Sequence, residues 1–106
     1  MLRLSEKLTE LKVVDDQHGI PTSCVDLAYA ISRIIDNIDE GDYEGRIFHL
    51  SNSSEEGSVT WADFAREIFL ISDKTVSVID CLSSEYLTKA KRPSFSILKN
   101  DSDIIL

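Results

Sequence analysis

The chain has 106 residues, of which 11 are Lys or Arg and 19 are Asp or Glu. The formal net charge of −8 argues against nucleic acid or an anionic membrane surface as a partner. Apolar residues make up 42%, which is typical of a folding chain and excludes a disordered one.

Cysteine usage and targeting signals point to a reducing compartment. Cys24 and Cys81 form no close-spaced motif, and the sequence shows no signal peptide and no apolar run long enough to span a bilayer. We therefore expect a cytoplasmic protein with one domain, residues 1–106.

The first predicted elements are a helix and a strand. Leu4, Leu8 and Leu11 recur at helical spacing, which predicts a short amphipathic helix within residues 1–10. The segment from Lys12 to Asp15 then has the pattern of a strand.

The next segment, from Val13 to Leu27 (VVDDQHGIPTSCVDL), combines a strand end, a polar loop and a helix start. Gly19 lets the backbone turn without a Cβ clash, Pro21 fixes φ, and Thr22 or Ser23 can cap the following helix. The loop displays polar side chains at the carboxyl end of a strand, where open α/β sheets bind ligands: Asp15, Asp16, Gln17 and His18. An ordinary strand–loop–helix connection explains the same residues equally well.

The clearest periodicity predicts a helix from Thr22 to Ile38. Its apolar positions keep a 3.6-residue period: Val25, Leu27, Ala28, Ile31, Ile34, Ile35 and Ile38. The acidic run from Asp36 to Glu44 that ends this helix is interpreted as solvated, because Ile38 stands where a calcium loop needs an oxygen ligand.

A second strand is expected from Arg46 to Leu50, whose aromatic and β-branched content favours extended structure. His49 within it is interpreted as a packed or hydrogen-bonded side chain, since no Cys, His or carboxylate stands at ligand spacing. Residues 51–58 have a loop composition.

The last elements are a helix, a strand and a basic tail. Thr60 and Asp63 resemble a capping box that starts a helix, with an apolar stripe of Trp61, Phe64, Ala65, Ile68 and Phe69. We expect Trp61 to be mostly buried. A short strand is predicted at residues 76–79 and one helical turn at residues 83–87. The tail that follows is locally basic in an otherwise acidic chain, because it carries Lys89, Lys91 and Arg92.

These elements alternate without an internal repeat, so the sequence predicts an α/β layer of about three short strands and three helices. No complete catalytic constellation accompanies them. The glycines stand alone, which excludes G-x-G-x-x-G and Walker loops, and none of Tyr29, Tyr43 and Tyr86 has Lys four residues later. G-x-S-x-G, H-E-x-x-H and Cys/His metal patterns are also missing. We therefore expect no catalytic, cofactor-binding or metal-ligating residue in this chain.

Taken together, segments 13–28, 45–69 and 85–100 resemble the carboxyl-terminal, substrate-binding part of dTDP-4-dehydrorhamnose reductases. The first matches V-x-D-Q-x-G-x-P-T followed by D-L-A. The second matches a strand, a loop and a Ser/Thr-Trp-x-x-[Phe/Tyr]-Ala helix, and the third matches Tyr-Pro-Thr-x-Ala-x-Arg-Pro-x-x-Ser-x-Leu. Leu87 departs from the Pro of the third motif.

The resemblance implies an extended short-chain dehydrogenase that uses NADPH or NADH to reduce the 4-keto group of a dTDP-6-deoxy sugar. This chain matches about the last third of such enzymes, so the Rossmann half and the Tyr/Lys pair are absent from it. We expect that the chain alone binds no nicotinamide cofactor and is catalytically incompetent.

The same resemblance places Gln17 and the loop of Gly19, Pro21 and Thr22 at the border of the dTDP-sugar pocket, with Arg92 on the diphosphate. Alternatively, Gln17 satisfies loop backbone and Arg92 pairs with one of the many carboxylates.

Two other functions fit the sequence. One is a non-catalytic regulatory subunit, since the methionine adenosyltransferase β-subunit resembles the same reductases. The other is a small binding domain that associates with itself through an exposed apolar face.

Overall fold

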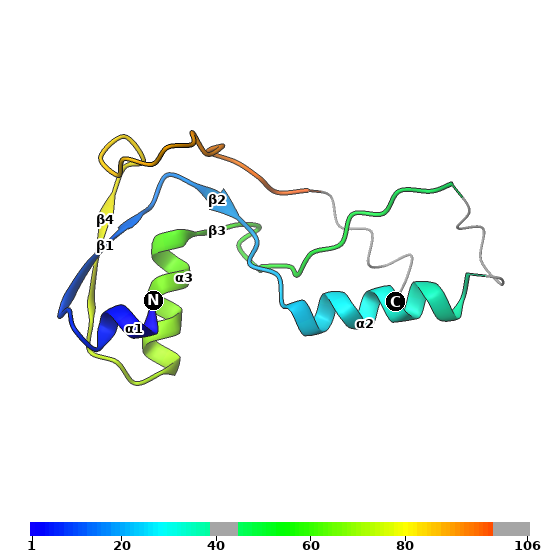
Figure 1. The fold of residues 1–106 in the computed structure, drawn as a ribbon, viewed down its shortest axis with the longest axis horizontal. Coiled ribbons are helices and arrows are strands. Elements are labelled where there is room, and N and C mark those ends of the chain that lie inside the picture. Colours follow the sequence, from blue (N-terminus) through cyan, green and yellow to red (C-terminus); the bar gives the residue numbers. More distant parts are fainter. Residues whose placement is uncertain (39–44, 99–106) are drawn as a thin grey trace.

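Helices and short strands alternate through residues 1–38 and 45–98, the part that the computed structural model describes (Figure 1). The helices are α1 (Leu2–Ser5), α2 (Cys24–Asp36) and α3 (Trp61–Ile71). The strands are β1 (Glu10–Val14), β2 (His18–Gly19), β3 (Val59–Thr60) and β4 (Ser77–Cys81). The predicted α/β class, with helices and few strands, is confirmed.

The core lies between α3 and a parallel sheet of β1 and β4 (Figure 1). Glu10 pairs with Ser77 and Val14 with Cys81, and such parallel neighbours require a crossover, which includes α3. The buried residues of this core are Val13, Ala62, Ala65 and Phe69, with Leu11, Ile68, Val76 and Val78 packed around them. Alanines at two helix positions let α3 approach the sheet closely, so the core is small.

A second, antiparallel sheet joins β2 to β3. The chain after β4 returns along β2: the His18 amide donates to the carbonyl of Ser94 (2.8 Å), and the Ser96 amide donates to the carbonyl of His18 (3.0 Å). Gly19 lies in this sheet, so its prediction as a turn residue was wrong. A Cβ on Gly19 would lie 3.2 Å from Ser96 Oγ, so the glycine serves this close approach.

Helix α2 extends away from the β1/β4 sheet and α3 (Figure 1). Its start is fixed by Ser23, whose Oγ accepts from the Asp26 amide (3.3 Å). Asn52 bonds the same turn twice, accepting from the Ser23 amide (2.6 Å) and donating to Asp26 Oδ2 (2.8 Å). Along α2 the buried residue is Ala30, so the predicted apolar face exists but faces solvent.

Several predicted boundaries need correction. The first helix ends at Ser5 and does not reach residue 10, since Glu10 already belongs to β1. The segment from Arg46 to Leu50, with His49 in it, is not a strand: it lies outside both sheets, and extended propensity needs a neighbouring strand to become a ladder. Residues 83–87 form a hydrogen-bonded turn and no helix. Residues 39–44 of the acidic run lie outside the described part.

Trp61 was wrongly predicted to be buried. Its side chain is 50% exposed, because α3 turns Ala62, Ala65 and Phe69 toward the sheet and leaves Trp61 at the edge of that face. The capping prediction is confirmed, since Thr60 is the N-cap and its Oγ1 accepts from the Asp63 amide (3.2 Å). Across the described residues, every helix is too short or too polar to cross a bilayer.

Candidate functional site

A hollow of about 980 Å³ lies beside β1, bounded by α1, the start of α3 and the chain after β4. Volumes of this order are typical of small-molecule sites. Its lining combines apolar, aromatic, hydroxyl and basic side chains: Met1, Leu4, Leu11, Lys12, Val13, Val14, Gln17, Trp61, Ser83, Ser84, Tyr86, Leu87, Thr88, Lys89, Ala90, Lys91 and Arg92.

The charges around this hollow oppose those of the whole chain. Four cations line it, Lys12, Lys89, Lys91 and Arg92, and no carboxylate does among the described residues. In a chain with 19 acidic and 11 basic residues, this segregation creates a local site for an anion.

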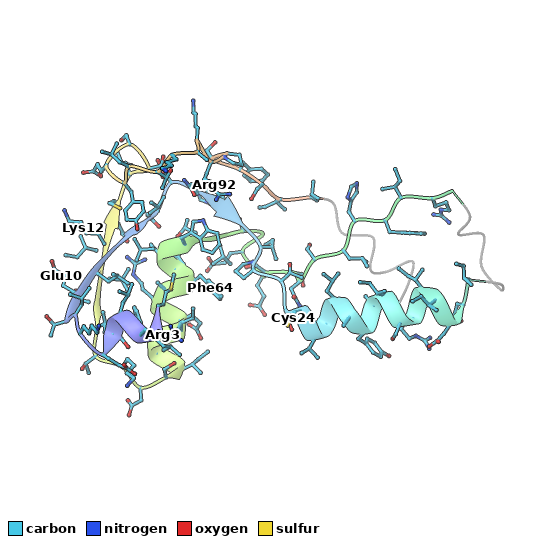
Figure 2. The ribbon with its side chains drawn as sticks, viewed as in Figure 1. Arg3, Glu10, Lys12, Cys24, Phe64 and Arg92 are labelled. Atoms are coloured by element: carbon cyan, nitrogen blue, oxygen red, sulfur yellow. The ribbon has the colours of Figure 1, made fainter. Side chains whose placement is uncertain are left out.

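A smaller hollow of about 300 Å³ adjoins the first, since Gln17, Trp61 and Arg92 line both. Figure 2 places Arg92 on the segment that crosses above β2 and the start of α3. Gly19 and Pro21 line the smaller hollow only. Four of the predicted site residues therefore lie around one pair of hollows.

Thr22 does not join them. It lines neither hollow, and its Oγ1 donates to the carbonyl of Ile20 (3.3 Å), which completes the turn before α2. Trp61, Lys12 and Tyr86 are lining residues that the sequence analysis did not propose as site residues. For Trp61 the misleading signal was its place in the apolar stripe of α3.

Asp16 ties the two sides of the large hollow together. Its Oδ1 accepts from the Ser83 amide (2.9 Å), and its Oδ2 accepts from Ser83 Oγ (2.8 Å). These hydrogen bonds, the one from the hydroxyl first, lower the pKa of the Asp16 carboxyl below its ordinary value. The side chain is therefore ionised and committed to Ser83 near neutral pH.

Thr60 occupies the floor near the smaller hollow. Thr60 is buried, and its Oγ1 lies 2.6 Å from Asp15 Oδ1 and 2.9 Å from Asp63 Oδ2. Because a hydroxyl has one proton, the two carboxylates share Thr60 as a hydrogen-bond donor. Arg66 pairs with Asp80 of β4 and with Asp63 (3.0 Å), and these carboxylates, Asp80 first, raise the pKa of its guanidinium. These contacts fix the start of α3 against both sheets.

Metal-binding and thiol chemistry have little support here. Within residues 1–38 and 45–98, no group of three His, Cys, Asp or Glu side chains could hold a metal ion. Cys24 is exposed and Cys81 is buried, both as free thiols, and burial raises the pKa of Cys81.

A family model described as the RmlD substrate binding domain matches residues 1–103. The chain belongs to this family. The resemblance to the substrate-binding part of dTDP-4-dehydrorhamnose reductases, inferred from the three sequence segments, is thus confirmed, and it extends over almost the whole chain.

Several relatives of this chain are named as reductases. A dTDP-4-dehydrorhamnose reductase of Sinorhizobium fredii is 40% identical over 95% of this chain and 35% of its own length. The crystal structure of a dTDP-4-dehydrorhamnose reductase from Clostridium acetobutylicum matches with a TM-score of 0.82 and 39% identity, covering 95% of this chain and 33% of that one. The Bacillus anthracis reductase, solved in complex with NADP, matches with a TM-score of 0.82 and 31% identity over 94% of this chain and 33% of its own. The chain spans about a third of the length of these relatives.

Proposed function

We propose that this chain forms the sugar-nucleotide-binding part of a dTDP-4-dehydrorhamnose reductase. The full reaction would be the NAD(P)H-dependent reduction of dTDP-4-dehydro-6-deoxy-L-mannose to dTDP-L-rhamnose. The observation that carries the proposal is the shared wall of the two hollows, which is lined by Gln17, Trp61 and Arg92.

The chemistry of a dTDP-sugar matches this wall and its surroundings. The diphosphate carries the negative charge, and a guanidinium binds phosphate oxygens in a bidentate manner, so we assign it to Arg92 at the junction. Lys89 and Lys91 add point charges beside it. The Gln17 amide can both donate to and accept from ligand oxygens.

The two hollows then divide the ligand. The larger one contains the aromatic rings of Trp61 and Tyr86, which offer flat apolar surface to a nucleobase. The smaller one, lined by Gly19, Pro21 and Ser96, leaves the volume of a sugar on the other side of Arg92. Thr22 is excluded from this assignment because it lines neither hollow.

Binding of dTDP to the 106-residue chain, followed by titration calorimetry, tests the assignment. We expect saturable binding that weakens with salt, and a loss of at least about tenfold in affinity for Arg92→Ala, because a charged hydrogen-bond pair is removed. Arg33→Ala, which removes the same charge from α2 outside both hollows, is the matched control. Equal losses in the two variants would reduce the effect to net charge and contradict a site at Arg92.

We also propose that the chain alone does not catalyse the reduction. Its sequence holds no phosphate-binding glycine motif and no Tyr with Lys four residues later, so both cofactor and proton donor would come from elsewhere in a full-length reductase. The free thiols of Cys24 and Cys81 are compatible with the predicted cytoplasmic location. Saturable NADPH binding or turnover by the purified chain would contradict this proposal.

A further inference from the structure

We propose that Asp16 is a positioning residue, which fixes the basic segment (residues 83–92) over the large hollow. The ligand effect of this contact rests on the proposed function, whereas its effect on the segment itself does not. Asp16 does not line the hollow, so it would act through Ser83 and the cations that follow.

The contact stands where the β1/β4 ladder stops. The last ladder bond is from the Asp15 amide to the carbonyl of Cys81 (3.0 Å), and the Asp16 carboxylate then takes both donors of Ser83. A carboxylate that accepts two hydrogen bonds from one residue fixes its orientation as well as its distance. The start of the basic segment is therefore tied to the loop that carries Gln17.

The other end of the segment is tied to β2, which directly follows the loop that carries Gln17. The His18 backbone bonds Ser94 and Ser96 just beyond Arg92. Lys89, Lys91 and Arg92 lie between the two attachment points, so all three cations belong to a span held at both ends.

Apolar packing does not hold this span. Every residue from 82 to 96 is exposed, and Leu87 is 95% exposed. Two side-chain contacts are internal to the segment or its border, beside the backbone hydrogen bonds of its turn: Glu85 Oε2 accepts from the Leu82 amide (2.7 Å), and Thr88 Oγ1 donates to the carbonyl of Ala90 (2.7 Å). The position of the cations relative to Gln17 thus depends on polar ties, and Asp16 supplies the side-chain tie.

If only charge mattered, removal of the Asp16 carboxylate would have the opposite effect on ligand affinity. Removing a carboxylate near an anionic ligand lowers the repulsion and should strengthen binding. If Asp16 positions the cations, its removal should weaken binding instead, so the sign of the change separates the two effects.

The experiment compares Asp16→Ala, Asp16→Asn and Glu85→Gln in the 106-residue chain. Asp16→Asn keeps an oxygen for the Ser83 amide and offers an N–H to its hydroxyl, so it should rescue the contact without the charge. Glu85→Gln removes a charge from the same turn without touching Asp16 and is the matched control. The readouts are amide hydrogen exchange over residues 83–92 and dTDP affinity by calorimetry.

We expect faster exchange at the Ser83 amide and at the turn amides of Glu85 and Tyr86 in Asp16→Ala alone, with dTDP affinity reduced by about tenfold, the loss of one charged hydrogen-bond pair. Asp16→Asn and Glu85→Gln should remain within about twofold of the parent in affinity. Unchanged exchange in Asp16→Ala, or tighter dTDP binding, would overturn the proposal. If the parent chain binds no dTDP, the proposed function fails, and the exchange comparison still decides whether Asp16 holds the segment.

Discussion

Two aromatic residues of α3 show how burial separates stability from recognition. Phe69 is 2% exposed in the core, whereas Trp61, on the same helix, is 50% exposed and lines both hollows. The Trp61 ring lies 6.4 Å from that of Phe64 at an angle of 55°, a tilted contact that orients it at the surface. A large apolar side chain left half-exposed beside cations is available to a ligand.

The first prediction compares these residues. Phe69→Ala should lower the free energy of unfolding by about 3–5 kcal/mol, because it opens a cavity in a small core. Trp61→Ala should cost much less stability but weaken dTDP binding. Urea unfolding, with calorimetry for the ligand, checks both. Equal losses of stability would mean that Trp61 also supports the core.

The second prediction concerns the Asp16 carboxyl, whose pKa is lowered by its hydrogen bonds from Ser83. A group with a depressed folded pKa contributes stability that is complete above its unfolded value and disappears as the pH falls through the folded value. We therefore expect the Asp16–Ser83 contact to be intact at neutral pH and to weaken below the ordinary carboxyl value of 3.8.

An NMR titration of the Asp16 side chain measures this directly. In the parent chain the midpoint should lie below 3.8, and Ser83→Ala should move it upward, because the hydroxyl contributes the largest lowering effect. Thr88→Ala, which changes a hydroxyl elsewhere in the basic segment, should leave the midpoint unchanged. The same midpoint in the parent chain and in Ser83→Ala would contradict the Asp16–Ser83 contact in solution.

At the scale of elements, helix starts are encoded more locally than strands. Ser23 and Thr60 cap α2 and α3 with their own hydroxyls, so the composition of one turn predicts each helix start.

The third prediction concerns the Thr60 cap. Thr60→Ala should lower the free energy of unfolding by about 0.5–2 kcal/mol through loss of the cap, and Thr60→Ser should retain most of the parent's stability. Thermal and urea unfolding measure the difference. A Thr60→Ala chain as stable as the parent would show that Asp15 and Asp63 reorganise without cost.

Two of the three predicted strands were found, and these two pair with each other in one sheet. The predicted segments 12–15 and 76–79 overlap β1 and β4, which pair with each other over the core, although Asp15 and Val76 lie just outside these strands. The segment 46–50 has equal extended propensity but joins neither sheet. β2 and β3 were not predicted, since each is two residues long and too short to show an alternating pattern.

The same contrast holds for the candidate site. The polar loop around Gln17 and the basic run before Pro93 are local features of the sequence, and residues of both line the hollows. The contact between Asp16 and Ser83 joins residues 67 positions apart, so no local pattern predicts it. The exposure of Trp61 was likewise not predictable from local sequence, because it depends on where the β1/β4 sheet lies.

At the scale of the whole molecule, the chain is extended for its length. Its radius of gyration is 17.4 Å, whereas about 13 Å is expected for a compact domain of this size. Figure 1 shows the reason: α2 lies at one end and the β1/β4 sheet with α3 at the other. A helix with a clear apolar face in such an extended chain leaves that face in water.

The last prediction is that the isolated chain associates through α2. Its exposed apolar side chains include Leu27, Ile31 and Ile35, which follow one stripe of the helix. In a purified sample a second copy of the chain is the partner available to cover this stripe, and two identical helices meet most simply about a two-fold axis. The net charge of −8 opposes unlimited aggregation, so a small, defined species is expected.

Light scattering at increasing concentration, with a hydrophobic dye, tests this association. Ile31→Glu combined with Ile35→Glu should give a monomer that keeps its fold, because both side chains are exposed and lie outside the α3 core. Val25→Glu, which changes an apolar residue of α2 other than Leu27, Ile31 and Ile35 and more exposed than either mutated isoleucine, is the control and should associate more than the double variant. A parent chain that stays monomeric at high micromolar concentration without binding the dye would contradict the prediction. It would show that another part of the same chain covers the apolar face of α2 in solution.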